Sequence, residues 1–224
     1  MPAKSVRKSV LAKSRLFLVE DHPVTREGFE QLLNYQADLY VCGQAGNAAK
    51  AITAIHALKP DLVIVDISLA DSNGLELIKQ LKTTMPNLPI LVLSMHDESL
   101  YAERALRAGA RGYVMKQAPT TEVMTAIRSL LKGELYLSEA MRSRLVHQHL
   151  QGIRREAKSE VDYLSDRELE VFELIGKGQT TRGIAGKLHV SMSTVETHRA
   201  HIKEKLKLAN SVELVRRAVE WVNQ

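Results

Sequence analysis

Residues 62–66, Leu-Val-Ile-Val-Asp, decide the fold of this 224-residue chain. Four consecutive apolar residues that stop at an acid are typical of a strand that is buried on both faces and ends at the edge of a sheet. The pattern recurs at residues 15–19, 90–93 and 112–115, and more weakly at residues 39–42. The sequence therefore predicts five buried strands.

Between the strands, apolar residues follow a helical spacing instead. Val123, Ile127 and Leu130 lie at positions i, i+4 and i+7, which places them on one face of a helix. Strands that alternate with amphipathic helices form a parallel sheet that is covered on both faces and joined by right-handed crossovers. We therefore expect a five-stranded, doubly wound parallel α/β domain of the flavodoxin type.

Side chains that can do chemistry follow these strands at the points where the strands end. They are Glu20, Asp21, Asp66, Ser94 and Lys116. Because the carboxyl ends of parallel strands share one edge of the sheet, these side chains should lie together. Neighbouring carboxylates repel one another unless a cation joins them, and oxygen ligands of this kind suit Mg²⁺.

The same groups suit the transfer of a phosphoryl group. A divalent cation, the Lys116 ammonium and the Ser94 hydroxyl around one carboxylate can bind and neutralise phosphoryl oxygens. Asp66 ends the middle strand and is therefore the expected nucleophile. Gly74, on the same loop, is expected at a turn that needs a positive φ angle.

Together with Tyr113, this set of residues resembles the receiver domain of bacterial two-component response regulators. Residues 66–76 (DISLADSNGLE) resemble the family's phosphoacceptor loop, and residues 109–116 (GARGYVMK) resemble its fifth strand. Ala70 departs from the family pattern, which usually has proline there, and this would leave the loop less rigid.

The resemblance to receiver domains implies a phosphorylation site. A sensor histidine kinase would supply the phosphoryl group to Asp66 in the presence of Mg²⁺. Ser94 and Lys116 would contact the phosphoryl oxygens, and Tyr113 would change rotamer as the switch residue. The implied metal ligands are Glu20, Asp21, Asp66 and the backbone carbonyl of Ser68.

The C-terminal part of the sequence predicts a small all-helical domain. Ser165 and Glu168 have the spacing of a capping box at the start of a first helix. A second helix is expected over residues 181–188, and a third begins at Ser191 or Ser193. Two short helices joined by a tight turn are typical of a helix-turn-helix, whose second helix enters the major groove of DNA.

Residues 163–221 resemble the LuxR-type helix-turn-helix of the NarL/FixJ regulators. The matching stretches are 164–168 (LSDRE), 193–199 (STVETHR) and 202–206 (IKEKL). By position, the resemblance implies that the base-facing residues are Glu196, Thr197 and Ala200. The implied phosphate contacts are Thr181, Ser193, Thr194, Arg199, Lys203 and Lys205.

Charge is distributed unevenly along the chain, whose formal net charge is +5. Residues 1–15 hold five bases and no acid, and residues 177–207 hold seven bases and two acids. A basic C-terminal part suits a polyanion such as double-stranded DNA. We divide the chain into a flexible basic tail (1–14), a receiver domain (15–138), a linker (139–162) and a helix-turn-helix domain (163–224).

Composition argues against a secreted or a membrane protein. The single cysteine, Cys42, has no partner for an internal disulfide, which favours a reducing compartment such as the cytoplasm. No apolar run approaches the roughly 18 residues that a membrane-spanning helix needs. No membrane contact is therefore expected.

We predict a DNA-binding response regulator that is not an enzyme, in which phosphorylation of Asp66 favours a homodimer and promoter binding. Two alternatives stay open. One is a phosphatase of the haloacid dehalogenase type, which needs an acid two residues after its nucleophile, where this chain has Ser68. The other is a DNA binder that does not depend on phosphorylation.

Overall fold

The sheet has the predicted architecture. The computed structural model describes residues 12–69, 72–150 and 160–223. Its main sheet consists of β1 (Ser14–Val19), β2 (Leu39–Ala45), β3 (Leu62–Val65), β6 (Ile90–Ser94) and β7 (Gly112–Met115). These five strands are parallel and lie in the order β2-β1-β3-β6-β7, so the prediction of a doubly wound sheet is confirmed.

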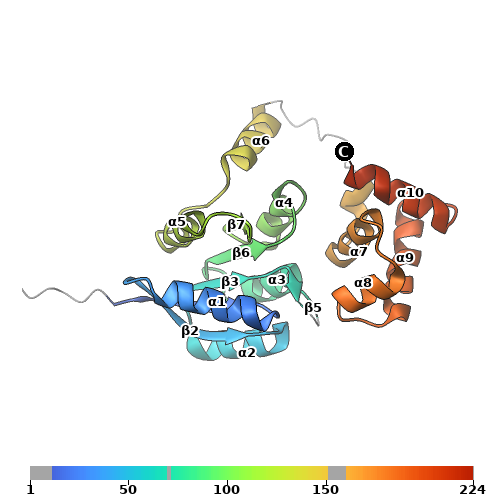
Figure 1. Cartoon of the computed structure of the whole chain (residues 1–224). Coiled ribbons are helices and arrows are strands. Elements are labelled where there is room, and N and C mark those ends of the chain that lie inside the picture. Colours follow the sequence, from blue (N-terminus) through green and yellow to red (C-terminus); the bar gives the residue numbers. More distant parts are fainter. Residues whose placement is uncertain (1–11, 70–71, 151–159, 224) are drawn as a thin grey trace, which may run out of the picture.

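Helices cover both faces of the sheet (Figure 1). They are α1 (Pro23–Asn34), α2 (Ala48–Leu58), α3 (Gly74–Thr84), α4 (Glu98–Ala108) and α5 (Thr120–Leu131). Successive strand residues point to opposite faces, so Val63 and Val65 pack with α2, α3 and α4, whereas Leu62 and Ile64 pack with α1 and α5. Both faces are thus buried, which explains the unbroken apolar runs.

A short hairpin that the sequence did not predict follows β3. It consists of β4 (Ser68–Leu69) and β5 (Ser72–Asn73), which pair antiparallel. Strands of two residues are too short to show any hydrophobic period. The predicted effect of Ala70 on this loop lies outside the described residues, as does the greater part of the predicted basic tail.

The backbone conformation of Gly74 differs from the expected one. The glycines with positive φ in the described chain are Gly109, Gly133 and Gly178, so the predicted reason for a glycine at position 74 was wrong. A Cβ on Gly74 would instead lie 2.0 Å from the backbone oxygen of Asp66. Glycine is required there because α3 begins directly against the backbone of the candidate site.

The C-terminal domain is all-helical, as predicted. It contains α7 (Asp166–Gly176), α8 (Thr181–Lys187), α9 (Met192–Lys205) and α10 (Ser211–Val222). The capping box at Ser165 is formed, and Ser191 caps α9 by accepting a hydrogen bond from the Thr194 N–H. The core of the domain includes Phe172, Val195 and Ile202, which are buried.

Two helical segments lie between the domains. Helix α6 (Glu139–Leu150) follows the receiver part, and the 3₁₀ helix η1 (Glu160–Tyr163) precedes α7. In Figure 1 the helices α7 and α8 of the C-terminal domain face α4 and β5. Hydrogen bonds from α4 to η1 and α7 join the two parts. In the part of the chain that the structure describes, no helix is both long enough and apolar enough to span a membrane.

Candidate phosphorylation site and DNA-reading helix

Lys116 joins two buried carboxylates at the carboxyl edge of the sheet. Its Nζ lies 2.7 Å from Asp66 Oδ2 and 2.5 Å from Glu20 Oε2. Asp66 is 4% exposed and Glu20 2% exposed. The strands β1 and β3 are neighbours, and β7 lies one strand further along, beyond β6. All of them end at the same edge of the sheet, and this brings together three side chains that are far apart in the sequence.

Burial and ion pairing shift the pKa values of Asp66 and Lys116 in opposite directions. Burial raises the pKa of Asp66, and the neighbouring Lys116 ammonium only partly offsets this. Burial lowers the pKa of Lys116, but the carboxylates of Asp66 and Glu20 outweigh it and raise the pKa overall. The lysine therefore stays charged and holds the two acids together.

A cation site fits beside Glu20 and Asp21. Glu20, Asp21 and His22 each offer one ligand atom, and these atoms lie within 4.8 Å of one another. Asp21 Oδ1 lies 2.7 Å from His22 Nδ1, yet this buried oxygen accepts no well-directed hydrogen bond from the described residues. A buried carboxylate oxygen without a donor suits a hard cation such as Mg²⁺.

The other predicted residues of the phosphorylation site surround Asp66. The backbone N–H of Ser68 lies 3.3 Å from Asp66 Oδ1. Ser94 is fully buried at the end of β6. Tyr113 is also buried, and its hydroxyl donates a hydrogen bond of 2.8 Å to the backbone oxygen of His96. The rotamer change of Tyr113 stays a prediction.

His96 connects this edge of the sheet to the C-terminal domain, a role that the sequence analysis missed. Its Nε2 lies 2.8 Å from Ser68 Oγ, and its Nδ1 lies 3.1 Å from Glu173 Oε2. Ser68 Oγ also donates to Glu170 Oε1 at 3.1 Å. His96 follows Ser94 by two residues, so the strand-end rule could have found it, whereas no sequence signal linked it to α7.

These interdomain groups are charged at neutral pH. Burial disfavours the imidazolium, but hydrogen bonds to Glu170 and Glu173 outweigh this and raise the pKa of His96 to about 9. Burial also opposes ionisation of Glu173, but His96 and Lys177 outweigh it and lower the pKa of this carboxyl to about 2. The contact is therefore one of opposite charges in a buried setting.

Helix α9 presents the predicted base-facing residues to solvent. Glu196, Thr197 and Ala200 are exposed, whereas Val195 and Ile202 on the other side of α9 are buried. Glu196 accepts a hydrogen bond of 2.8 Å from Thr181 Oγ1. The helix thus has one face for the core and one face free to contact another molecule.

The predicted phosphate contacts differ in their surroundings. Ser193 and Thr194 bond the Ser191 hydroxyl at the start of α9. The Arg199 side chain is only 14% exposed and lies 3.5 Å from Glu196. Lys203 is partly exposed, whereas the Lys205 ammonium lies 2.6 Å from Glu168, so a DNA phosphate would compete with this carboxylate for Lys205.

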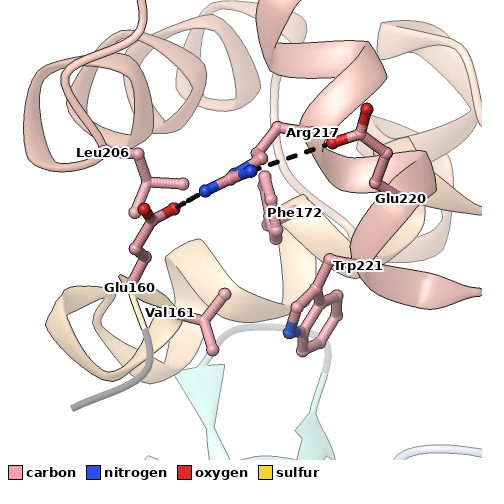
Figure 2. A pocket seen from close by; sticks show the side chains of 7 residues that line it. All are labelled: Glu160, Val161, Phe172, Leu206, Arg217, Glu220 and Trp221. Carbon is pink, nitrogen blue, oxygen red and sulfur yellow. Dashed lines mark hydrogen bonds and ion pairs between the residues drawn. The ribbon is translucent and has the colours of Figure 1, made fainter. Parts of the chain in front are cut away.

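A pocket in the C-terminal domain has its charges already paired. Figure 2 shows Arg217 between Glu160 and Glu220. The guanidinium nitrogens lie 2.5 Å from Glu160 Oε2 and 3.8 Å from Glu220 Oε2. The lining residues are Glu160, Val161, Phe172, Leu206, Arg217, Glu220 and Trp221. The apolar walls continue into the domain core, so this pocket gives no independent sign of a ligand.

Both parts of the chain match known families. Residues 16–128 match the response regulator receiver domain, and residues 162–218 match the bacterial regulatory proteins of the luxR family. The oxygen regulatory protein NreC of Staphylococcus carnosus is 36% identical over 210 residues, which cover 92% of this chain and 97% of that protein. NreC of Staphylococcus aureus strain JH9 has the same identity and coverage.

Solved structures show the same two-domain arrangement of folds. The RcsB response regulator of Salmonella typhimurium matches with a TM-score of 0.63 and 25% identity, covering 94% of this chain and 98% of that chain. A structure of the RcsB–DNA complex matches with a TM-score of 0.55 and 27% identity, covering 94% and 99%. The chain therefore belongs to the DNA-binding two-component response regulators of the NarL/FixJ type, which join a receiver domain to a LuxR-type helix-turn-helix.

Proposed function

We propose that Asp66 accepts a phosphoryl group from a phosphohistidine of a sensor kinase, and that this modification controls promoter binding by α9. The observation that carries the proposal is the position of Lys116, whose ammonium contacts Asp66 and Glu20 together. A carboxylate held by a lysine, beside further acids and a buried hydroxyl, is equipped to receive a phosphoryl group and to stabilise the dianionic product.

In the proposed transfer, an Asp66 carboxylate oxygen attacks phosphorus. The P–N bond of the phosphohistidine breaks, and its electron pair stays on the imidazole nitrogen. Glu20, Asp21, Asp66 and the backbone carbonyl of Ser68 would hold Mg²⁺, which when bound neutralises charge on the phosphoryl oxygens. Lys116 and Ser94 would donate hydrogen bonds to these oxygens.

The proposed target of the C-terminal domain is promoter DNA. RcsB, a relative by structure, has been solved in complex with DNA. In this chain Glu196, Thr197 and Ala200 would face bases, and the phosphate contacts would come from Thr181, Ser193, Thr194, Arg199, Lys203 and Lys205. A promoter target places the working protein in the bacterial cytoplasm.

A homodimer is the proposed DNA-bound state. Val212, Val215 and Val219 lie at positions i, i+3 and i+7 of α10, and they are 79%, 41% and 37% exposed. A stripe of exposed valines on one helix face suits packing against a second copy. In this proposal the chain acts as a regulator rather than an enzyme, because Ser68 supplies no general acid two residues after Asp66.

Phosphorylation of Asp66 is tested with a labelled small-molecule donor. Full-length protein is incubated with ³²P-phosphoramidate and Mg²⁺, and the incorporated label is counted. The wild type should take up label, and Asp66→Asn should take up none, because an amide is not a competent acceptor.

Asp97→Asn is the matched control at the same edge of the sheet. Asp97 caps α4 by accepting a hydrogen bond of 2.8 Å from the Ser99 N–H, and asparagine caps equally well. This variant should keep its label. Full labelling of Asp66→Asn would refute the assignment, and equal promoter affinity with and without the donor would favour a DNA binder that is independent of phosphorylation.

A further inference from the structure

The carboxylate of Glu196 is held in one position on the exposed face of α9. Its side chain is 58% exposed, yet Oε1 accepts a hydrogen bond of 2.8 Å from the Thr181 hydroxyl, and Oε2 lies 3.5 Å from Nε of Arg199. An exposed glutamate without such partners would sample several rotamers. The two contacts therefore fix the direction in which this carboxylate faces solvent.

The two partners of the carboxylate are placed by the helix-turn-helix itself. Thr181 is the first residue of α8, and the Thr180 side chain fixes the start of this helix by accepting a hydrogen bond of 3.1 Å from the Gly183 N–H. Arg199 follows Glu196 by three residues on α9, and its side chain is only 14% exposed. The position of the carboxylate thus follows from how α8 and α9 are placed against each other.

A carboxylate at this position can accept hydrogen bonds but cannot donate them. The DNA phosphates therefore repel it, and of the base edges in the major groove only the amino groups of cytosine and adenine can donate to it. Adenine also presents the acceptor N7 beside its amino group, which suits an amide better than a carboxylate. Glu196 is thus matched to the N4 amino group of a cytosine. Each carboxylate oxygen has two lone pairs, so Oε1 can accept from a base and from Thr181 at once.

We propose that Glu196 reads a cytosine in the promoter sequence and that Thr181 is the positioning residue that directs its carboxylate. The inference rests on the proposed promoter binding by α9 and adds the base that this helix recognises. The Thr181 hydroxyl has a single hydrogen, so while it donates to Glu196 it cannot donate to a phosphate. A phosphate contact by Thr181 would then come from its backbone N–H, whereas Arg199 has further N–H groups for a phosphate besides Nε.

Holding the carboxylate in place should affect discrimination between bases more than overall affinity. A fixed acceptor meets an N4 amino group without further ordering of the side chain, and it stays fixed against a base that presents an acceptor instead. Without the hydroxyl, the side chain can turn away from an unsuitable base, so the penalty for that base falls. A phosphate contact has a different signature, because it contributes to binding at every sequence and to the salt dependence.

Selection of DNA sequences from a randomised library tests the proposal. Full-length protein treated with phosphoramidate and Mg²⁺ is used, the bound DNA is sequenced, and fluorescence anisotropy measures the affinities of the selected site and of its single-base variants. The wild type should select a site with a cytosine whose replacement lowers affinity on the order of tenfold. Glu196→Gln should prefer adenine at that position, because an amide pairs with N6 and N7 of adenine.

Thr181→Val keeps the shape of the side chain and removes the hydroxyl. It should reduce the discrimination at the cytosine to about threefold or less, and it should leave the other positions of the site and the salt slope unchanged. Thr181→Ser keeps a hydroxyl and should keep the discrimination. Circular dichroism checks that each variant is folded.

Two control variants carry the same chemical changes elsewhere in the chain. Glu204→Gln changes the other acid of α9, which is exposed near the end of that helix, and Thr53→Val changes an exposed threonine of α2. Both should select the wild-type sequence with wild-type discrimination.

The outcomes separate this inference from the proposed function. A wild type that selects no sequence would overturn promoter binding by α9 and the inference with it. A selected site without a cytosine that depends on Glu196 would overturn the inference alone, as would wild-type discrimination in Thr181→Val or lost discrimination in Thr181→Ser. A uniform loss of affinity in Thr181→Val, with a salt slope less negative by about 0.9, would also overturn it and would make the hydroxyl a phosphate contact.

Discussion

At the scale of single residues, the candidate site is organised by close approach and by charge. Lys116 compensates the buried acids Asp66 and Glu20, so that neither is left as an isolated buried charge. Gly74 lets the backbone of α3 begin against Asp66. Lys116 has a side chain long enough to reach both acids, and Gly74 has no side chain to separate the two backbones.

Gly74→Ala should destabilise the receiver domain by about 2 kcal/mol or more, since the added Cβ would force the backbone of Asp66 to move. Chemical denaturation measures the change. Gly186→Ala is the control: nothing lies within 4 Å of its Cβ position, and the helix α8 should gain about 0.5–1 kcal/mol. Equal effects of the two substitutions would contradict the close-approach explanation.

Mg²⁺ should raise the thermal unfolding temperature of the protein, because a ligand that binds only the folded state stabilises it. At ten times the dissociation constant the gain is about 1.4 kcal/mol. Differential scanning fluorimetry in EDTA and in Mg²⁺ measures it. Asp21→Asn should lose most of the gain, whereas Asp61→Asn, before β3 at the opposite edge of the sheet, should keep it. A wild type insensitive to saturating Mg²⁺ would count against the metal site.

At the scale of elements, α9 separates a structural face from a functional one. Val195 and Ile202 hold it in the core, and the exposed side carries the residues proposed to meet DNA. The Ser191 cap fixes where the helix begins, and thereby which side chains occupy its first turn. The residue at which α9 begins therefore determines which of its side chains would face DNA.

Lys203→Ala should lower the salt dependence of DNA binding. Each phosphate that a protein neutralises contributes about −0.9 to the slope of log affinity against log salt, so the slope should become less negative by about that amount. Fluorescence anisotropy over a salt series measures it. Lys50→Ala on the exposed side of α2 is the control and should leave the slope unchanged. An unchanged slope for Lys203→Ala would remove this residue from the proposed phosphate contacts.

At the scale of the whole molecule, the two domains share a buried charged interface. Glu173 faces His96 and Tyr101 of the receiver and also Lys177 at the end of its own helix. These three groups donate hydrogen bonds to the ionised carboxylate of Glu173. Protonation of Glu173 should therefore weaken docking of the domains.

Acid should separate the domains before it unfolds them. The pKa of Glu173 is lowered from 4.5 to about 2, so its contribution is fully present above pH 4.5 and is lost as the pH falls toward about 2. Small-angle scattering between pH 7 and pH 3 should show expansion while circular dichroism still reports helices. Glu173→Gln should be expanded already at pH 7. A wild type equally compact at both ends of this range would contradict the expectation.

The parallel sheet, the residues at its carboxyl edge and the helix-turn-helix could all be predicted from the amino-acid sequence. Hydrophobic periodicity gives the strands and helices, and parallel topology forces the strand ends, with Asp66 and Lys116, onto one edge. The strand-end rule works because it needs only the chain direction and not the packing of side chains.

The close approach at Gly74 and the contact of α7 with the receiver could not be predicted from the sequence and are visible only in the folded molecule. On the sequence, Glu170 and Glu173 are two acids of an amphipathic helix, and they differ in no local pattern from acids that face water. Their burial depends on where the receiver domain places Ser68 and His96, which precede them in the sequence by 102 and 77 residues respectively. Hydrophobic periodicity indicates which face of a helix or strand is apolar. Contacts between polar faces of separate domains depend on how the domains are placed relative to each other, and the spacing of residues within one helix carries no information about that placement.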